Sequence, residues 1–260
     1  MQRKKSVILT SATLAVNGSF SFQIKRLGLE DFAPQTSIIG SPFNYKEQAR
    51  LLIPTDIPAI KEVTMEQFSY EVAKKLWRLS SMTEGKTLVL FTSYEMLRIV
   101  YDFMRKWNED HILHLIGQGI TSGSRVKLMK MFKQSEQAML FGTSSFWEGI
   151  DLPGNELTTV VIVRLPFSPP DDPLIQAQFE KVKEEGGNPF MDISLPQAII
   201  RFKQGFGRLI RSMTDKGAVF VFDRRITSSR YGKQFILSLP DVPVYKGEFD
   251  QLLKDHHTYL

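Results

Sequence analysis

Two hydrophobic patterns alternate along this chain and predict its elements. Short, nearly continuous apolar runs are typical of buried strands, and we place strands at residues 7–10, 36–39, 50–53, 87–91, 114–116, 138–141, 158–163 and 218–222. Longer segments with an apolar residue every three or four positions predict helices, at residues 64–79, 94–107, 124–132, 174–184, 194–212, 231–237 and 249–253. Strands separated by helices predict an α/β fold, a parallel sheet with helices on both faces.

One predicted helix, residues 194–212, has the most informative polar pattern. Ser194 and Gln197 have the spacing of a capping box, as Thr64 and Gln67 have at an earlier helix start. Its apolar side chains share one face, and a second face has a narrow stripe formed by Arg201, Gln204, Arg208 and Arg211. Guanidinium groups one turn apart with few carboxylates nearby favour an anion such as phosphate. The alternative is a solvated charged face.

Two glycines interrupt the same predicted helix. Gly205 and Gly207 each cost about 1 kcal/mol relative to alanine inside a helix. Such a cost makes sense where another group must approach the backbone closely, because glycine has no Cβ.

The composition excludes several classes of protein. The 260 residues contain no cysteine, which excludes disulfides, thiolate zinc sites and iron–sulfur clusters within this stretch. No apolar run predicts a membrane span or a signal peptide, so we expect a cytoplasmic protein with no membrane partner. Net charge is +5, and residues 201–233 alone hold nine Lys or Arg against two Asp. This local excess favours the phosphates of a nucleotide or a nucleic acid, although a modest excess is also common in soluble proteins.

Small polar or charged residues follow three of the predicted strands. They are Thr92 and Ser93, the segment 142–151, and the segment 223–225. Ligands of open α/β sheets bind outside the carboxyl ends of the strands, where hydroxyl groups and free backbone N–H groups suit phosphate oxygens. Ordinary turns and helix caps are the alternative interpretation of each segment.

Other motifs do not predict a catalytic or metal site. Gly85-Lys86-Thr87 is similar to the end of a Walker A loop, but it precedes a strand, and position 80 is Ser80 where that motif requires glycine. No Walker B carboxylate pair follows an apolar strand. His111 and His114 lack a third metal ligand, so we predict no metal site, and His256-His257 is predicted to be solvated.

Four segments, in order, resemble known helicase motifs. SATL at 11–14, VLFTSY at 89–94, GTSSFWEGIDLPG at 142–154 and QGFGRLIRS at 204–212 resemble helicase motifs III, IV, V and VI. Their order and wording are similar to the DinG/XPD-type branch of superfamily 2, over nearly the whole chain. The resemblance implies a second RecA-like motor domain at residues 41–260. Residues 1–40 would then be the trailing edge of a first motor domain and a linker.

The resemblance also implies a role for each matching residue. Arg208 and Arg211 match the motif VI arginines that reach the nucleotide phosphates across the cleft between the two motor domains. The positions implied to respond to the nucleotide are Gln204, Gly149 and Asp151. Coupling positions are Ser11 and Thr13. Contacts to the phosphates of a single strand are implied for Thr92, Ser93, Thr143 and Ser145. Arg201 lies outside the motif and is interpreted as a nucleic-acid or surface contact.

The expected function follows from this resemblance. The chain would be the C-terminal motor half of an ATP-dependent DNA helicase, with single-stranded DNA and the missing N-terminal motor domain as partners. ATP with Mg²⁺ would be the cofactor, and the magnesium would be held by that missing domain, so the fragment alone is not expected to hydrolyse ATP. One alternative is a motor-derived binding or regulatory module of a DinG-like exonuclease. Another, an unrelated nucleotide-binding α/β enzyme, requires a glycine-rich first turn that the sequence lacks.

Overall fold

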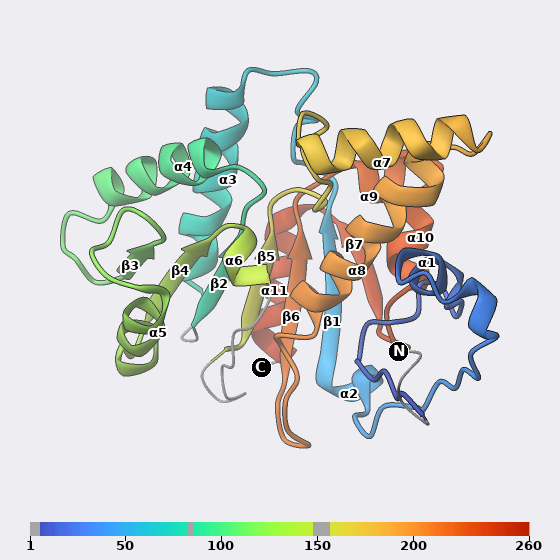
Figure 1. Cartoon of the computed structure of the whole chain (residues 1–260). Coiled ribbons are helices and arrows are strands. Elements are labelled where there is room, and N and C mark those ends of the chain that lie inside the picture. Colours follow the sequence, from blue (N-terminus) through green and yellow to red (C-terminus); the bar gives the residue numbers. More distant parts are fainter. Residues whose placement is uncertain (1–5, 83–85, 148–156, 260) are drawn as a thin grey trace.

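The protein is described by a computed structural model that covers residues 6–82, 86–147 and 157–259. In these residues, seven strands form one sheet in the order β3-β4-β2-β5-β6-β1-β7 (Figure 1). Every neighbouring pair is parallel. The strands are β1 Ala49–Pro54, β2 Thr87–Leu90, β3 His114–Gly117, β4 Ala138–Gly142, β5 Thr159–Ile162, β6 Gly217–Val221 and β7 Val244–Gly247. Because the strands are parallel, their carboxyl ends share one edge of the sheet.

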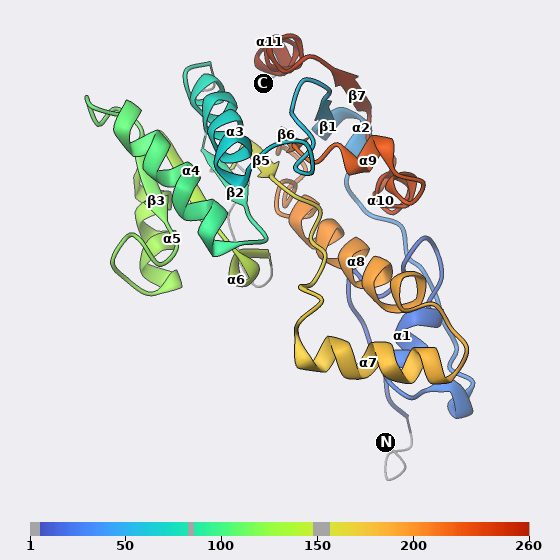
Figure 2. The same ribbon diagram turned by 90° about the horizontal axis from the view of Figure 1, so that it is seen from above.

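Helices connect the strands and cover both faces of the sheet (Figures 1 and 2). They are α1 Ser21–Arg26, α2 Tyr45–Gln48, α3 Met65–Ser80, α4 Tyr94–Trp107, α5 Arg125–Gln134, α6 Ser144–Trp147, α7 Pro173–Glu184, α8 Leu195–Phe206, α9 Arg225–Ser228, α10 Gly232–Leu237 and α11 Phe249–Tyr259. Two shorter elements are η1, a 3₁₀ turn at Glu30–Phe32, and η3, a π-helical turn at Phe190–Ser194. The predicted fold class, a RecA-like parallel sheet with helices on both faces, is confirmed.

Alternate residues of each strand enter two separate cores. Leu88 and Leu90 of β2 pack with apolar residues of α5, α6, α8 and α10. Val89 of β2 and Phe91, which follows it, pack instead with α3, α4 and α11. Side chains of a strand alternate between faces, so a sheet covered on both sides needs continuous apolar strands. This explains why uninterrupted apolar runs located the central strands correctly.

Side chains cap several helices where the sequence predicted a start. Thr64 Oγ1 accepts from the backbone N–H of Gln67, and the Gln67 side chain accepts from the Thr64 N–H, which completes the predicted capping box. The box predicted at Ser194 and Gln197 is wrong. Ser194 has helical backbone angles and no capping hydrogen bond, because η3 leads directly into α8.

Three further predictions about elements are wrong. Residues 7–10 and 36–39 form no strand, because they are exposed and no neighbouring strand pairs with them. The edge strand β7 was not predicted, because its sequence, Val-Tyr-Lys-Gly, lacks an apolar run. His256 was predicted to be solvated, yet it is fully buried, because α11 extends past residue 253 and packs against β1 and β7.

The N-terminal segment lies beside α7, α8 and α10 (Figures 1 and 2). The Lys203 ammonium of α8 donates to the Ala15 carbonyl at 2.9 Å, and Val16 packs against the core beneath that helix. Asn17 donates to Gln234 of α10, and Lys25 pairs with Glu185 beyond α7. Residues 15–25 are therefore attached to the face of the sheet that α5, α6, α8 and α10 cover.

Candidate functional site

The residues predicted to contact a nucleic acid lie at the carboxyl ends of β2 and β4. These two strands are neighbours, and Leu90 is paired with Gly142. Thr92 follows β2 and is half-buried, and Thr143 follows β4 and is half-buried. Gln118, at the end of β3, fixes Thr143, because its Oε1 accepts from the Thr143 N–H at 2.8 Å and hydroxyl at 3.0 Å. The fold thus brings these polar residues to one edge of the sheet.

The two serines of the predicted contact set have different surroundings. Ser93 is the N-cap of α4, and its hydroxyl accepts from the Met96 N–H at 3.3 Å, so this side chain caps the helix. Ser145 is exposed on α6, and its carbonyl accepts from the Arg125 guanidinium at 2.9 Å.

Trp147 connects three of the predicted motifs, a role that sequence reasoning missed. Its indole N–H donates to the Phe91 carbonyl at 3.1 Å, at the end of β2. Its ring lies against Gly205 of α8, where an added Cβ would be 2.9 Å from ring atom Cζ3. Its carbonyl accepts from Arg208 Nη2 at 2.5 Å. The close approach predicted at Gly205 is confirmed, and the approaching group is a tryptophan of the same chain.

Arg208 and Arg211 lie beyond the end of α8. The predicted helix over 194–212 is too long, because α8 ends at Phe206 with Gly207 as its C-cap. The four-residue polar stripe is therefore not one helix face. Arg208 is 7% exposed and fixed to the Trp147 carbonyl, whereas Arg211 is exposed on the following loop. A buried guanidinium held by a carbonyl keeps a fixed direction.

Asp215 organises the loop that carries Arg211. This buried carboxylate accepts from the backbone N–H of Arg211 at 2.6 Å and of Ser212 at 2.8 Å, and also from the Ser212 hydroxyl. The side chain of Gln48, in α2, donates to the Ser212 and Asp215 carbonyls. Aspartate is typical of such turns, so the sequence offered a local signal for Asp215. It offered none for Gln48, which is 164 and 167 residues away from these partners.

The remaining predicted positions are divided between α8, the N-terminal segment and the undescribed residues. Gln204 is half-buried, and its Oε1 has no hydrogen-bond partner within residues 6–82, 86–147 and 157–259. Ser11 and Thr13 form one turn, in which the Thr13 N–H donates to the Ser11 hydroxyl at 3.2 Å. Gly149 and Asp151 lie outside the described residues.

Lys203 links the N-terminal segment to α8 next to Gln204. Its ammonium donates to the Ala15 carbonyl, and burial lowers the pKa of this lysine from its ordinary value. Thr13 therefore lies two residues before Ala15, the residue that Lys203 attaches to α8.

The segment after β6 also carries charge at the carboxyl edge. Asp223 is buried and forms an ion pair with Arg225. The Nη2 and Nε of Arg225 lie 2.6 Å and 3.1 Å from Oδ2 of Asp223. Arg224 is exposed and pairs with Glu62 at 3.4 Å. The ion pair with the buried Asp223 makes Arg225 the more constrained of the two arginines.

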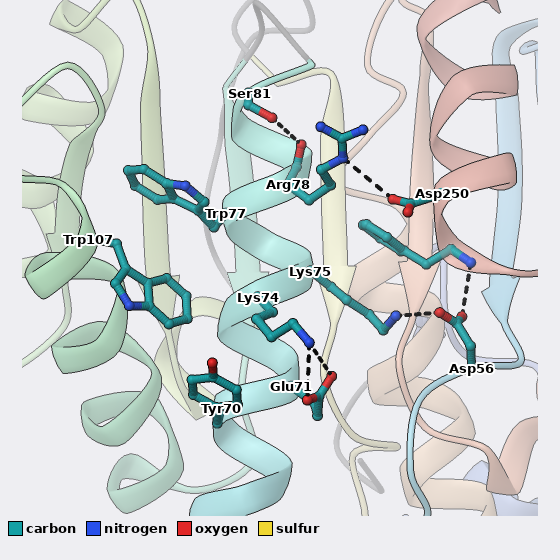
Figure 3. A pocket seen from close by; sticks show the side chains of 11 residues that line it. Asp56, Tyr70, Glu71, Lys74, Lys75, Trp77, Arg78, Ser81, Trp107 and Asp250 are labelled. Carbon is teal, nitrogen blue, oxygen red and sulfur yellow. Dashed lines mark hydrogen bonds and ion pairs between the residues drawn. The ribbon is translucent and has the colours of Figure 1, made fainter.

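A groove on the face of the sheet away from α8 has no excess charge. It lies between α3, α4 and the start of α11, with Trp77, Trp107 and Tyr70 on one side (Figure 3). Each of its cations pairs with a carboxylate within the groove: Lys74 with Glu71, Lys75 with Asp56, and Arg78 with Asp250. The groove therefore offers little attraction to an anion.

The residues that the structure describes contain neither a candidate metal site nor a membrane-spanning helix. Among these residues, no group of three or more His, Asp or Glu side chains is placed to hold a metal ion. Each helix in the same ranges is too short or too polar to cross a lipid bilayer.

Comparison with known proteins relates this arrangement to one family. The model of the helicase C-terminal domain matches residues 76–242. The 3'-5' exonuclease DinG of Bacillus subtilis is 48% identical over 242 residues, which are 93% of this chain and 26% of that protein. The ATP-dependent DNA helicase YoaA of Haemophilus influenzae is 41% identical over 234 residues, which are 90% of this chain and 35% of that protein. The chain thus spans about a quarter to a third of the length of these curated relatives.

Solved structures share the fold. Apo XPD superposes with a TM-score of 0.61 at 22% identity, covering 76% of this chain and 40% of the other. S. cerevisiae Dbp5 bound to RNA and ADP BeF3 gives 0.58 at 15% identity, covering 94% of this chain and 54% of the other. The ordered motifs, the parallel sheet and the matched domain agree. The chain therefore belongs to the helicase C-terminal domain family.

Proposed function

We propose that this chain is the C-terminal motor half of an ATP-dependent DNA helicase of DinG type. Residues 1–40 are then the trailing edge of a first motor domain and a linker, and residues 41–260 are the second RecA-like domain. The observation that carries the proposal is the chain of contacts from Arg208 through Trp147 to Phe91. It joins a fixed arginine to the end of β2, where a nucleic-acid contact is predicted.

Arg208 and Arg211 are proposed to act on a nucleotide that the first motor domain holds. ATP with Mg²⁺ would supply the phosphoryl group that is transferred to water, and the magnesium would be held by that first domain. A guanidinium supplied from a second domain stabilises charge on the transferred phosphate only when the cleft is closed. Such arginines contribute roughly 10³- to 10⁵-fold in rate. The fixed direction of Arg208 and the ordered loop of Arg211 suit this role.

Nucleotide state is proposed to reach the nucleic acid through neighbouring positions. Gln204 would contact the nucleotide from α8, where its Oε1 lacks a partner among the described residues. Gly149 and Asp151 of motif V would respond to the same nucleotide. Ser11 and Thr13 would couple the first domain to α8 through the anchor at Lys203.

Single-stranded DNA is the proposed nucleic-acid partner. Thr92, Ser93, Thr143 and Ser145 would contact its phosphates through hydroxyl or backbone groups at the ends of β2 and β4. Contacts to phosphate carry no sequence information, which suits a protein that moves along a strand.

Arginine substitutions test the proposed catalytic role. In a protein that joins this domain to its first motor domain, Arg208→Ala or Arg211→Ala should lower ATP turnover at least about a hundredfold. Strand binding should change far less. Arg105→Gln is a matched control, because Arg105 is exposed on α4 and pairs with Asp102 of the same helix. Equal losses of turnover and strand binding would contradict the assignment of these arginines.

The chain alone is expected to hydrolyse no ATP, because it lacks a phosphate-binding loop of Walker A type. Release of phosphate from ATP should be measured on highly purified chain, with and without Mg²⁺ and single-stranded DNA. Robust activity that depends on the metal would refute the proposed division of labour between two domains.

A second candidate function is a motor-derived binding or regulatory module of a DinG-like exonuclease. The observation in its favour is the 48% identity to a Bacillus subtilis protein named as an exonuclease. The sequence upstream of this chain separates the two functions. Intact Walker A and Walker B motifs there favour a motor, and degenerate motifs favour a module.

A further inference from the structure

A group of arginines and aromatic rings lies at the carboxyl ends of β5 and β6, separate from the residues assigned above. We name it the arginine–aromatic cluster and define it as Arg164, Phe167, Phe190, Arg225 and Tyr231. Arg164 follows β5, and the loop from β5 to α7 carries Phe167 (Figure 2). Phe190 belongs to η3, and Arg225 and Tyr231 lie at the starts of α9 and α10.

The nearby carboxylate, Asp223, already accepts as many hydrogen bonds as a carboxylate can. Its Oδ1 accepts from the N–H and the Nε of Arg225, both at 3.0 Å. Its Oδ2 accepts from the Leu165 N–H at 2.9 Å and from Arg225 Nη2 at 2.6 Å. A carboxylate offers about four lone-pair sites. Asp223 therefore compensates Arg225 and has no site left for a second guanidinium.

Arg164 lies near Asp223 but makes no ion pair or hydrogen bond with it. Its Nε is inaccessible to solvent and has no hydrogen-bond partner within residues 6–82, 86–147 and 157–259. Burial is the main cause that lowers the pKa of Arg164 from its ordinary value. Repulsion from Arg225 lowers this pKa further, and attraction to Asp223 offsets part of the lowering. Burial of this Nε–H without an acceptor is costly, because arginine stays protonated and this donor has lost its contact with water.

A second arginine extends the positive surface along α8. Arg201 is half-buried, and its Nη1 donates to the Ser168 hydroxyl at 2.7 Å, on the loop that carries Phe167. The serine hydroxyl is neutral, so this contact leaves the charge of Arg201 in place. Arg164 therefore lies on this short loop and Arg201 contacts it, and among the described residues neither arginine is hydrogen-bonded to a carboxylate.

The aromatic members of the cluster form a stacked surface beside these cations. Phe167 and Phe190 stack with centroids 5.7 Å apart and planes at 25°, and the Arg225 guanidinium lies 5.3 Å from the centroid of Phe167. Phe190 is 37% exposed, and its ring is 5.1 Å from Tyr231. π-helical turns such as the one that carries Phe190 are frequent at functional sites.

We propose that this cluster is a binding site for single-stranded nucleic acid, in which Arg164 receives a backbone phosphate and the exposed face of Phe190 stacks on a base. The site deepens the proposed function, on which it rests, by extending the strand contact from β2 and β4 across the sheet to β5 and β6. Cationic groups that follow the backbone, next to aromatic rings that stack bases, are the usual components of single-strand binding sites. A free phosphate would use only the arginines and would leave the exposed ring without a role.

Binding measurements with variants of this chain test the proposal. Fluorescence anisotropy with a labelled oligothymidylate of about 15 nucleotides should be recorded over a series of salt concentrations. Arg164→Gln should weaken binding about tenfold and reduce the slope of log K against log salt by about 0.7, the value for one phosphate contact on a single strand. Phe190→Ala should weaken binding about tenfold without changing that slope, because stacking releases no counterions.

Matched variants separate these effects from a loss of folding. Arg105→Gln removes an exposed arginine of α4 and should leave affinity and slope near those of the original chain. Arg164→Lys retains the charge and should retain the slope while losing the planar fork. In the unaltered chain, the Nε–H resonance of Arg164, assigned by its absence from the Arg164→Lys spectrum, should shift when the oligonucleotide is added.

Each outcome decides the proposal. Unchanged affinity and slope in Arg164→Gln, or an Arg164 resonance that does not move, would overturn it while leaving the strand contact at β2 and β4 intact. Failure of the unaltered chain to bind the oligonucleotide at low salt would overturn both. Inorganic phosphate should not reproduce the resonance shift at the same phosphate concentration. If it does, the cluster is a general oxyanion site, and the assignment of Phe190 to a base is wrong.

Discussion

At the scale of single residues, burial decides what a side chain does. His256 was expected in solvent, but it lies on the buried side of α11, where its Nε2 is 3.2 Å from the hydroxyl of Thr159 in β5. Burial is the main cause that lowers the pKa of His256 to about 4, and the charges of Arg50 and His257 lower it further. A polar side chain near a chain end therefore acts as part of the core.

His256 should make the stability of the fold depend on pH. The unfolded chain binds a proton at His256 below about pH 6.5, whereas the folded chain does so only near pH 4. The stabilisation is therefore fully present above pH 6.5 and falls as pH drops toward 4, by on the order of 3 kcal/mol in total. Urea unfolding across this range checks it. His256→Gln should remove most of the dependence on pH. His257→Gln should remove much less, because the charge of His257 is a smaller cause of the lowered pKa than burial; equal behaviour of both variants would contradict the assignment.

At the scale of elements, contacts between α6, α8 and β2 hold the candidate site together. Trp147 is the common partner, with its indole N–H on Phe91 and its ring on Gly205. Glycine is unfavourable in a helix, so its presence in α8 is explained by the space that the ring requires. The same tryptophan orients Arg208 through its carbonyl.

Gly205→Ala should therefore destabilise the protein, although alanine favours a helix by about 1 kcal/mol. An added Cβ would lie 2.9 Å from the Trp147 ring and 3.2 Å from Leu90 Cδ1. Overpacking of a core costs about 1–3 kcal/mol, which offsets the helical gain. The midpoint of urea unfolding measures the balance. Gly40→Ala is the control, because an added Cβ there meets nothing within 4 Å; a midpoint raised by Gly205→Ala would show that the ring relaxes freely.

At the scale of the whole molecule, the fold extends past the part that the family model matches. That match ends at residue 242, but β7 pairs with β1, and α11 buries Phe249, Leu252 and Leu253 in the core that it shares with α3 and α4. Burying three such side chains contributes about 5–9 kcal/mol. The stability of a whole domain is about 5–15 kcal/mol.

Truncation after residue 242 should consequently leave a chain that does not fold cooperatively. Removal of residues 1–10 should have little effect, because those that the structure describes, residues 6–10, are exposed. Circular dichroism during thermal unfolding compares the two truncated chains. A cooperative transition near that of the intact chain after loss of β7 and α11 would show that these elements are dispensable.

The local pattern of the sequence was sufficient for much of the fold. Apolar runs located the five inner strands, β2, β4, β5, β6 and β1, because a strand covered on both faces leaves an uninterrupted apolar run. The capping box of Thr64 and Gln67 was correct, because its hydrogen bonds join residues three apart. Predictions failed at the end of α8, where the pattern was extended past the C-cap Gly207, and at the edge strand β7, whose sequence has no apolar run.

What the sequence by itself determined was the alternation of strands and helices and the order of the motifs, because both depend on residues that are close in the chain. Only the tertiary structure decided the placement of Trp147, whose contacts join residues 56 and 61 positions apart. It alone also decided the burial of His256 and the saturation of Asp223 beside Arg164. The physical reason is that burial and hydrogen-bond saturation depend on every group that surrounds an atom, and most of those groups come from distant parts of the chain.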